Sequence, residues 1–192
     1  IPDPAPIEIN LTAAKNLVVT IPGHGPNANQ QVLMTAHLDS TTNWDGDPRQ
    51  DAPGAEDNAS GVTALLEAAR LFRYYRFDRT IKLIFFTAEE QGLLGSEAYV
   101  DDHRSEMSSI VGVVNLDMFG YDRDQDSCIE LHVGDMAASN TVGTCFVSMI
   151  NNYSLGLSHD FLTGLEALGA SDHASFWDAG VGAIEILENF ST

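Results

Sequence analysis

The chain has 192 residues, enough for one domain, and its hydrophobic fraction of 44% agrees with a compact core. Its formal net charge is −19, and Lys15 and Lys82 are its only lysines. This charge argues against nucleic acids and anionic membranes as partners, because their phosphates would repel the chain. The apolar stretches are strand-length, whereas a membrane helix needs roughly 20 residues, so no membrane span is predicted.

Strand-like and helix-like segments alternate along the chain. Apolar, β-branched runs predict strands at 16–21, 31–36, 81–87, 111–116, 128–133 and 183–187. Helices are predicted between them, at 60–75, 96–103, 137–153 and 173–179; in the first, apolar residues recur at spacings of three and four. This alternation predicts an α/β fold, a three-layer α/β/α sandwich around a mostly parallel, mixed central sheet.

Metal-type ligands occur in four short segments, three of which directly follow a predicted strand. These candidate ligands are His37, Asp57, Glu89, Glu90 and Asp117. The ends of parallel strands form the rim of the active site in open α/β sheets, so the ligands also outline a cleft. Segment 40–56, which links the first ligand to the second, is rich in Asp, Asn, Gly and Pro. A loop of that length in a compact domain is more often functional than idle.

His37 and Asp39 lie on one side of the backbone if the segment is extended, because side chains alternate along a strand. In one interpretation His37 binds a metal ion, and Asp39 steadies the other ring nitrogen, as carboxylates commonly do for zinc-bound imidazoles. In the other interpretation the pair is only the polar end of a strand.

Asp57 directly precedes the first predicted helix. Asn58 or Ser60 is a suitable N-cap there, and Asp57 would then be only a favourable charge near the helix dipole. Alternatively, Gly54 and Gly61 allow the close backbone approach of a tight turn, in which Asp57 bridges two cations.

Two interpretations also fit Glu89 and Glu90. The sequence from Thr87 to Glu90 matches the Thr-x-x-Glu capping box of a helix start. Against this, Gly92 and Gly95 would weaken the first turns by about 1 kcal/mol each relative to alanine. An irregular turn fits better, with one glutamate on a metal ion and the other holding the proton of a metal-bound water.

Asp117 ends an apolar, buried-type strand, where a carboxylate without a partner is costly, so a nearby cation is expected. Among the other histidines, His173 is expected in a structural or supporting role rather than as a direct ligand. The histidines expected to be solvent-facing or capping groups are His24, His103, His132 and His159. The two cysteines, Cys128 and Cys145, fit either one disulfide or two buried thiols.

The combination resembles the M28 zinc peptidases, and within them the secreted bacterial leucyl-type aminopeptidases. The resemblance runs from about residue 16 to 190. The matching segments are His-Leu-Asp-Ser at 37–40, Ala-Pro-Gly-Ala-Glu-Asp-Asn-Ala-Ser-Gly at 52–61, Ala-Glu-Glu-Gln-Gly-Leu-Leu-Gly-Ser at 88–96, Asn-Leu-Asp-Met at 115–118 and Ser-Asp-His-Ala-Ser-Phe-Trp-Asp-Ala-Gly at 171–180. The fold that this resemblance implies is that of the zinc exopeptidases.

The resemblance also implies the roles of individual residues. His37 and Asp117 would hold one zinc ion, Glu90 would help to hold a second, and Asp57 would bridge the two. Glu89 would be the general base on the bridging water. The family also implies a cis peptide between Asp57 and Asn58 and a place for Met118 in the hydrophobic pocket for the first side chain.

The chain departs from the family pattern in two places. Residues 163–170 contain no cysteine, although leucyl-type relatives often have a short-range disulfide there. The family's fifth ligand, a histidine after the last strand, is not found before Thr192. We therefore expect residues 1–192 to be a single M28-type catalytic domain that lacks the C-terminal segment with this ligand. A replacement by His173 and an impaired site are the alternatives.

The resemblance implies a metal-dependent aminopeptidase that removes apolar amino-terminal residues from peptides and is secreted or periplasmic. One alternative is a glutaminyl cyclase-like transferase of the same fold, which uses one zinc ion. The other is a catalytically impaired scaffold. The expected partners are peptides with a free amino terminus.

Overall fold

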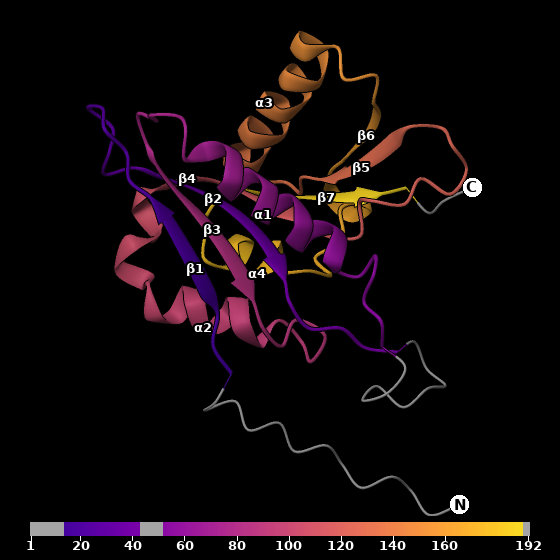
Figure 1. The fold of residues 1–192 in the computed structure, drawn as a ribbon, viewed down its shortest axis with the longest axis horizontal. Helices are drawn as coiled ribbons and strands as arrows, with labels where there is room; N and C mark the ends of the chain where they lie inside the picture. Colours follow the sequence, from indigo (N-terminus) through magenta and orange to yellow (C-terminus); the bar gives the residue numbers. More distant parts are fainter. Residues whose placement is uncertain (1–13, 43–51, 190–192) are drawn as a thin grey trace, which may run out of the picture.

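A computed structural model describes residues 14–42 and 52–189 of the chain. Its centre is a seven-stranded sheet in the order β1-β3-β2-β4-β7-β5-β6 (Figure 1). The strands are β1 (Leu17–Ile21), β2 (Gln31–His37), β3 (Thr80–Phe86), β4 (Ile110–Leu116), β5 (Cys128–His132), β6 (Ser158–Leu162) and β7 (Ala183–Glu188). Strands β1 and β3, and β5 and β7, pair antiparallel; the other neighbours pair parallel, which confirms the mostly parallel, mixed sheet.

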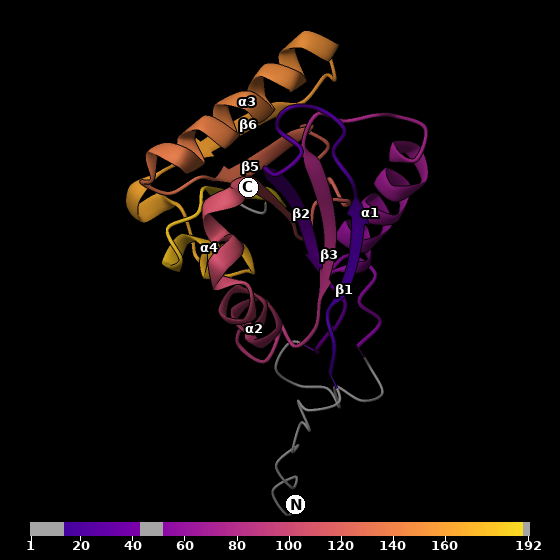
Figure 2. The ribbon, with the colours of Figure 1, turned by 90° about the vertical axis from the view of Figure 1, so that its left-hand side faces the viewer.

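Helices cover both faces of this sheet. The α-helices are α1 (Ala59–Phe72), α2 (Leu94–Asp102), α3 (Ala137–Tyr153) and α4 (His173–Asp178), and short 3₁₀ helices lie at Arg104–Ser109 and Gly164–Glu166. In Figure 2, α1 lies on one side of β1, β2 and β3, and α2 lies on the other. The predicted three-layer sandwich is therefore confirmed.

The alternation of side chains along β3 shows how the two cores arise. Leu83 and Phe85 pack in one apolar cluster with residues of α1 and α3, and Ile84 and Phe86 pack in a second cluster with residues of α2 and α4. Successive side chains of a strand point to opposite faces, so a strand covered on both sides is apolar throughout.

Most predicted elements are present with small shifts at their ends. The helix at 137–153 agrees at both ends, α1 stops at Phe72, and α2 begins at Leu94. Strand β6 was missed, because its sequence Ser-His-Asp-Phe-Leu is largely polar and it lies at the sheet edge. In the predicted loop at 40–56, residues 43–51 lie outside the described part of the chain.

Both cysteines are free: Cys128 is buried and Cys145 is exposed. The disulfide alternative is therefore wrong, and so is the expectation of two buried thiols, because the Cys145 side of α3 faces away from the core. In the described ranges 14–42 and 52–189, no helix is long and apolar enough to cross a membrane.

Candidate metal centre

The carboxyl ends of three adjacent parallel strands meet at one edge of the sheet. His37 is the last residue of β2, Asp117 directly follows β4, and Glu89 follows β3 after two residues. Because β3, β2 and β4 are neighbours in the sheet, residues far apart in the sequence come together at this edge. Asp57 joins them from the turn before α1. The arrowheads of β2 and β3 in Figure 1 point towards this edge.

The imidazole of His37 is the centre of the group. It is buried, and its Nε2 atom lies 3.0 Å from Oδ1 of Asp57, 3.3 Å from Oδ1 of Asp117 and 4.0 Å from Oε2 of Glu89. Ligand atoms of His37, Asp57 and Asp117 lie within 4.8 Å of one another, and so do those of His37, Glu89 and Glu90. Such a convergence of one imidazole and several carboxylate oxygens matches the donors that zinc accepts.

These side chains line a cleft of about 350 Å³. The cleft also has an apolar part, formed by Met118, Leu168, Ala170 and Leu187. One wall therefore carries charge and another carries hydrocarbon, which suits a ligand with a charged end and an apolar side chain.

The carboxylate of Asp39 has a different role from the one predicted. Nδ1 of His37 donates to the backbone carbonyl of Asp39 at 2.9 Å, and the nearest carboxylate oxygen is 3.8 Å away. The two carboxylate oxygens instead accept hydrogen bonds from the backbone N–H groups of Glu89 and Glu90, each at 3.1 Å. Asp39 thus fixes the Glu89–Glu90 turn, and a carbonyl group orients His37 with Nε2 facing the acidic residues.

The capping-box alternative for Thr87 and Glu90 is wrong. Helix α2 begins at Leu94, and its cap residue Leu93 has a φ of 61° and makes no side-chain capping bond. Ala88 also has a positive φ, 57°, so the segment is an irregular turn, as the glycines indicated. Oε1 of Glu90 accepts a hydrogen bond from the backbone N–H of Thr41 at 3.0 Å, which ties this turn to the segment after β2.

Of the two predicted caps, Asn58 rather than Ser60 forms the N-cap of α1. Its side-chain oxygen accepts from the N–H of Gly61 at 2.9 Å, and its Nδ2 donates to the carbonyl of Leu116 at 2.9 Å. The peptide bond between Asp57 and Asn58 is cis, as the resemblance implied. Because Asn58 provides the cap, the carboxylate of Asp57 is left to face the cleft.

A chain of hydrogen bonds holds Asp117 from behind. Its Oδ1 faces His37, and its Oδ2 accepts a hydrogen bond from the Ser171 hydroxyl at 2.6 Å. That hydroxyl accepts from Nδ2 of Asn115 at 2.9 Å, whose Oδ1 accepts from Thr35 at 2.6 Å. All four residues are buried, so Asp117 has little freedom to turn away.

Electrostatics also indicate a cation in this cleft. Burial alone would lower the pKa of His37, but hydrogen bonds to Asp117 and Asp57 outweigh it and raise the pKa to about 11. Burial raises the pKa of Glu89 to about 8, and the neighbouring carboxylates add to this effect while His37 opposes it. Burial also raises the pKa of Glu90. Glu89 and Glu90 therefore resist ionisation until a further positive charge offsets their burial and the repulsion of neighbouring carboxylates.

Sequence reasoning missed a second row of buried polar residues behind the cleft. His132 was expected to face solvent or cap a helix, but it is buried, its Nδ1 accepts from the N–H of Leu168 at 2.8 Å, and its Nε2 donates to Glu130. Nε2 of His173 donates to the carbonyl of the same Leu168 at 2.9 Å, and Nδ1 lies 3.6 Å from Glu185. The two histidines therefore hold the backbone of one cleft residue.

His24 and His103 lie where the sequence predicts, one facing solvent and the other capping a helix. His24 is exposed, and Nδ1 of His103 donates to the carbonyl of Tyr99 at the end of α2, as a capping group does. Two further buried carboxylic acids lie near the cleft: burial raises the pKa of Asp172 to about 7 and that of Glu185 well above its ordinary value. Glu185 lies in an apolar strand that carries no ligand pattern, and Asp172 lies in the matching segment at 171–180, where no role was predicted for its carboxylate.

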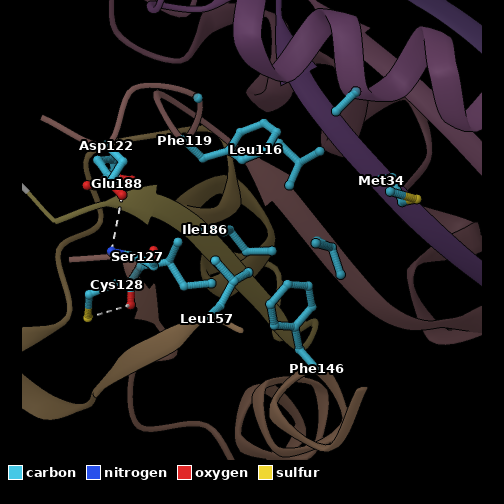
Figure 3. Close-up of a pocket in the computed structure, with 14 residues that line it drawn as sticks. Met34, Leu116, Phe119, Asp122, Ser127, Cys128, Phe146, Leu157, Ile186 and Glu188 are labelled. Carbon is cyan, nitrogen blue, oxygen red and sulfur yellow. Dashed lines mark hydrogen bonds between the residues drawn. The ribbon is translucent and has the colours of Figure 1, made fainter. Parts of the chain in front are cut away.

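A second pocket, of about 400 Å³, lies on the α1 and α3 side of the sheet. Figure 3 shows its mostly apolar lining, including Leu116, Phe146 and Ile186. It contains none of the residues grouped around His37, so its size does not make it the candidate active site. Asp122 and Glu188 lie at its polar end.

Comparison with known proteins shows the family of the chain. The model of peptidase family M28 matches residues 16–191 of the chain, which therefore belongs to this family. Aminopeptidase YwaD of Bacillus subtilis is 36% identical over 162 residues, which cover 81% of this chain and 31% of that protein. Leucine aminopeptidase 1 of Trichophyton rubrum is 33% identical over 172 residues, which cover 85% of this chain and 44% of that protein.

The chain is also similar to solved structures of zinc aminopeptidases. BSAP, a zinc aminopeptidase from Bacillus subtilis, superposes with a TM-score of 0.72 at 31% identity, over 90% of this chain and 39% of that one. An Acidobacteriales glutaminyl cyclase, at 22% identity and a TM-score of 0.66 over 90% of this chain and 58% of that one, shares the fold alone. The chain spans less than half the length of YwaD, leucine aminopeptidase 1 and BSAP.

Proposed function

We propose that this chain carries the metal-binding and catalytic residues of a zinc-dependent aminopeptidase. The observation that carries the proposal is the convergence of His37, Asp57, Asp117, Glu89 and Glu90 at the carboxyl ends of three parallel strands. Membership of the M28 family and the aminopeptidase names of the relatives support the same reaction class.

The cleft residues offer a full set of three ligands for one zinc ion and an incomplete set for a second. His37, Asp57 and Asp117 provide three ligands whose atoms are already within 4.8 Å, the usual number for a catalytic zinc ion. Asp57 and Glu90 would contribute to a second position. When bound, zinc supplies a positive charge that polarises a carbonyl group and lowers the pKa of water.

Glu89 is the proposed general base. Its side chain is largely buried, faces the same space as His37, and is held by the Asp39 carboxylate through its own backbone N–H. In this role Glu89 accepts a proton from the attacking water and passes it to the leaving amine nitrogen. Asp39 acts on catalysis by positioning this residue.

The cleft also suggests which substrates enter. The carboxylates of Asp57 and Glu90 attract the ammonium group of a free amino terminus, whereas the apolar wall around Met118 and Leu187 favours an apolar first side chain. The substrates would therefore be peptides whose first residue is apolar. We infer a secreted or periplasmic location from the charge of −19, and immunoblotting of cell fractions and medium tests it.

The variant Glu89→Gln tests the catalytic assignment. We expect hydrolysis of leucine p-nitroanilide by the zinc-loaded protein to fall by at least about 100-fold, because a positioned base contributes about 10²–10⁴. Zinc content, measured by elemental analysis, should stay the same. The matched control is Glu97→Gln, on the exposed side of α2, which should keep full activity.

Three other results would each contradict a part of this proposal. Equal activity of Glu89→Gln and the unmodified protein would refute the assignment of the base. Cyclisation of glutamine-initiated peptides without release of amino acids would support the transferase alternative instead. Zinc binding with neither reaction would support an impaired scaffold.

A further inference from the structure

A second acidic group lies in the loop between β4 and β5, outside the cleft. Asp122, Asp124 and Asp126 alternate in this loop, and Glu188 approaches them from the end of β7. One carboxylate oxygen from each of the four residues lies within 4.8 Å of the others. Figure 3 shows the side chains of Asp122 and Glu188 next to each other, at the polar end of the apolar pocket.

The state of Glu188 is an independent sign that this group has a ligand. The residue is only 3% exposed, and its Oε1 atom is buried without a hydrogen-bond partner among the described residues. A buried carboxylate oxygen without a partner is strongly unfavourable. Burial, and then the charges of Asp122, Asp126 and Asp124, raise the pKa of Glu188. A cation would relieve both the desolvation and the repulsion.

Backbone N–H groups of the loop donate to all three aspartates, and that of Asp126 lies 3.3 Å from Oδ1 of Asp124. Asp122 accepts from the N–H groups of Asp126 at 3.2 Å and Ser127 at 3.1 Å, and Asp126 accepts from that of Cys128 at 2.7 Å. Nδ2 of Asn189 also donates to Asp126 at 3.0 Å. Each of these bonds occupies one side of a carboxylate oxygen, which has further lone pairs for a cation.

We propose that Asp122, Asp124, Asp126 and Glu188 form a binding site for a calcium ion. The ligands are all carboxylate oxygens, without nitrogen or sulfur, which favours a hard cation over zinc. Their Asp-x-Asp-x-Asp spacing matches positions one, three and five of a calcium loop. Ser127 occupies the sixth position, where such loops have glycine, and its φ is 56°.

Glu188 takes the place of the glutamate that closes such a loop, although it comes from a distant strand. Calcium accepts six to eight oxygens in irregular geometry, whereas magnesium demands a near-ideal octahedron and keeps several waters. A site assembled from a loop and a separate strand is therefore better suited to calcium. This inference is independent of the proposed peptidase activity.

The acidic site lies where a bound ion would connect the β4–β5 loop to strand β7. The loop begins at Asp117 and Met118, which face the cleft, and Glu56 accepts from the N–H groups of Gly120 at 2.7 Å and Tyr121 at 3.1 Å. A calcium ion would join the loop to β7 across the sheet. It would thereby hold the segment that carries a predicted zinc ligand.

Thermal unfolding with and without calcium tests the proposal. The protein is passed over chelating resin, resupplied with one equivalent of zinc for the position formed by His37, Asp57 and Asp117, and titrated with calcium chloride or magnesium chloride. At a free calcium concentration 100 times the Kd, we expect Tm to rise by about 5–10 °C. Calorimetric titration should show one calcium ion per chain, and magnesium at the same concentration should give less than half the shift.

Two variants locate the effect. Asp124→Asn and Glu188→Gln keep the shape of the side chains, and each should reduce the calcium-induced shift at least fivefold. Without calcium, both should unfold at the same or a higher temperature than the unmodified protein, because each removes a repulsive charge. Asp102→Asn, an exposed position at the end of α2, is the matched control and should keep the full shift.

Two results would overturn the proposal. One is the absence of a Tm shift with calcium up to about 10 mM. This concentration is about ten times the Kd of the weakest extracellular calcium modules. The other is an equal shift in Asp124→Asn, in Glu188→Gln and in the unmodified protein. Because the calcium-free Tm of each variant is measured as well, a folding defect is seen directly and is not mistaken for loss of binding.

Discussion

Replacing Asp39 by Asn distinguishes the role that the structure gives this residue from the predicted one. The carboxylate accepts two backbone hydrogen bonds, from Glu89 and Glu90, each at 3.1 Å. An amide has only one oxygen, so one N–H group would face an NH₂ group instead. Hydrogen bonds to charged groups contribute about 1.5–3 kcal/mol each. Since the Asp39 side chain is 21% exposed, we expect a loss of about 2 kcal/mol of unfolding free energy.

The assay combines thermal unfolding, zinc titration and steady-state kinetics. A loss of this size lowers Tm by about 4–8 °C in a chain of this length. Displacement of Glu89 should lower kcat by about 10–100-fold. Affinity for the zinc ion that His37 is proposed to hold should change less than about threefold, because a backbone carbonyl orients that imidazole.

The opposite pattern would refute this reasoning. If Asp39 supported the imidazole directly, zinc affinity would fall by about 10–100-fold and Tm would follow only through zinc. An unchanged Tm in the metal-free protein would contradict the role of Asp39 in the turn. Asp102→Asn again serves as the control for loss of one exposed negative charge.

Two further expectations concern stability. Gly95→Ala should lower the free energy of unfolding by about 1–3 kcal/mol, because the added Cβ would lie 2.1 Å from the carbonyl oxygen of Thr87. Urea unfolding measures this change. An increase in the free energy of unfolding, which helix propensity alone suggests, would contradict the prediction. His173 is buried beside Glu185 and His132, and burial lowers its pKa to about 4, below the 6.5 of the unfolded state. Folding favours the neutral form of His173. The free energy of unfolding is therefore unaffected by this histidine above pH 6.5 and falls by about 3 kcal/mol as the pH decreases from 6.5 towards 4. In metal-free protein, His173→Gln should flatten this part of the stability profile, and an unchanged slope would argue against it.

The sequence alone was sufficient for the parts of the site that follow from strand ends. His37, Glu89 and Asp117 come together because β2, β3 and β4 are parallel neighbours, and apolar runs locate the ends of such strands. The glycines after Glu90 correctly indicated an irregular turn, because their low helix propensity outweighed the capping-box pattern.

What could not be predicted depends on contacts between distant segments. The two oxygens of Asp39 reach the backbone of a turn 50 residues later, and no local pattern encodes that distance. His132 is buried and accepts a hydrogen bond from Leu168, 36 residues later in the chain, and the polar sequence of the neighbouring strand β6 did not indicate a strand. The acidic loop lacked a visible partner in the sequence, since Glu188 follows it by 62 positions.

Zinc binding to the unmodified chain and to the double variant His37→Ala, Asp117→Asn tests the central claim most directly. After loading and dialysis, elemental analysis should find at least one zinc ion per unmodified chain, because His37, Asp57 and Asp117 already converge. The double variant should retain less than about a tenth of that zinc, since it loses two of the three converging ligands, and Asp57 and Glu90 alone fall short of the three protein ligands of a catalytic zinc ion. An unmodified chain without zinc, or a double variant with the same zinc content, would contradict the assignment of this cleft as a metal centre.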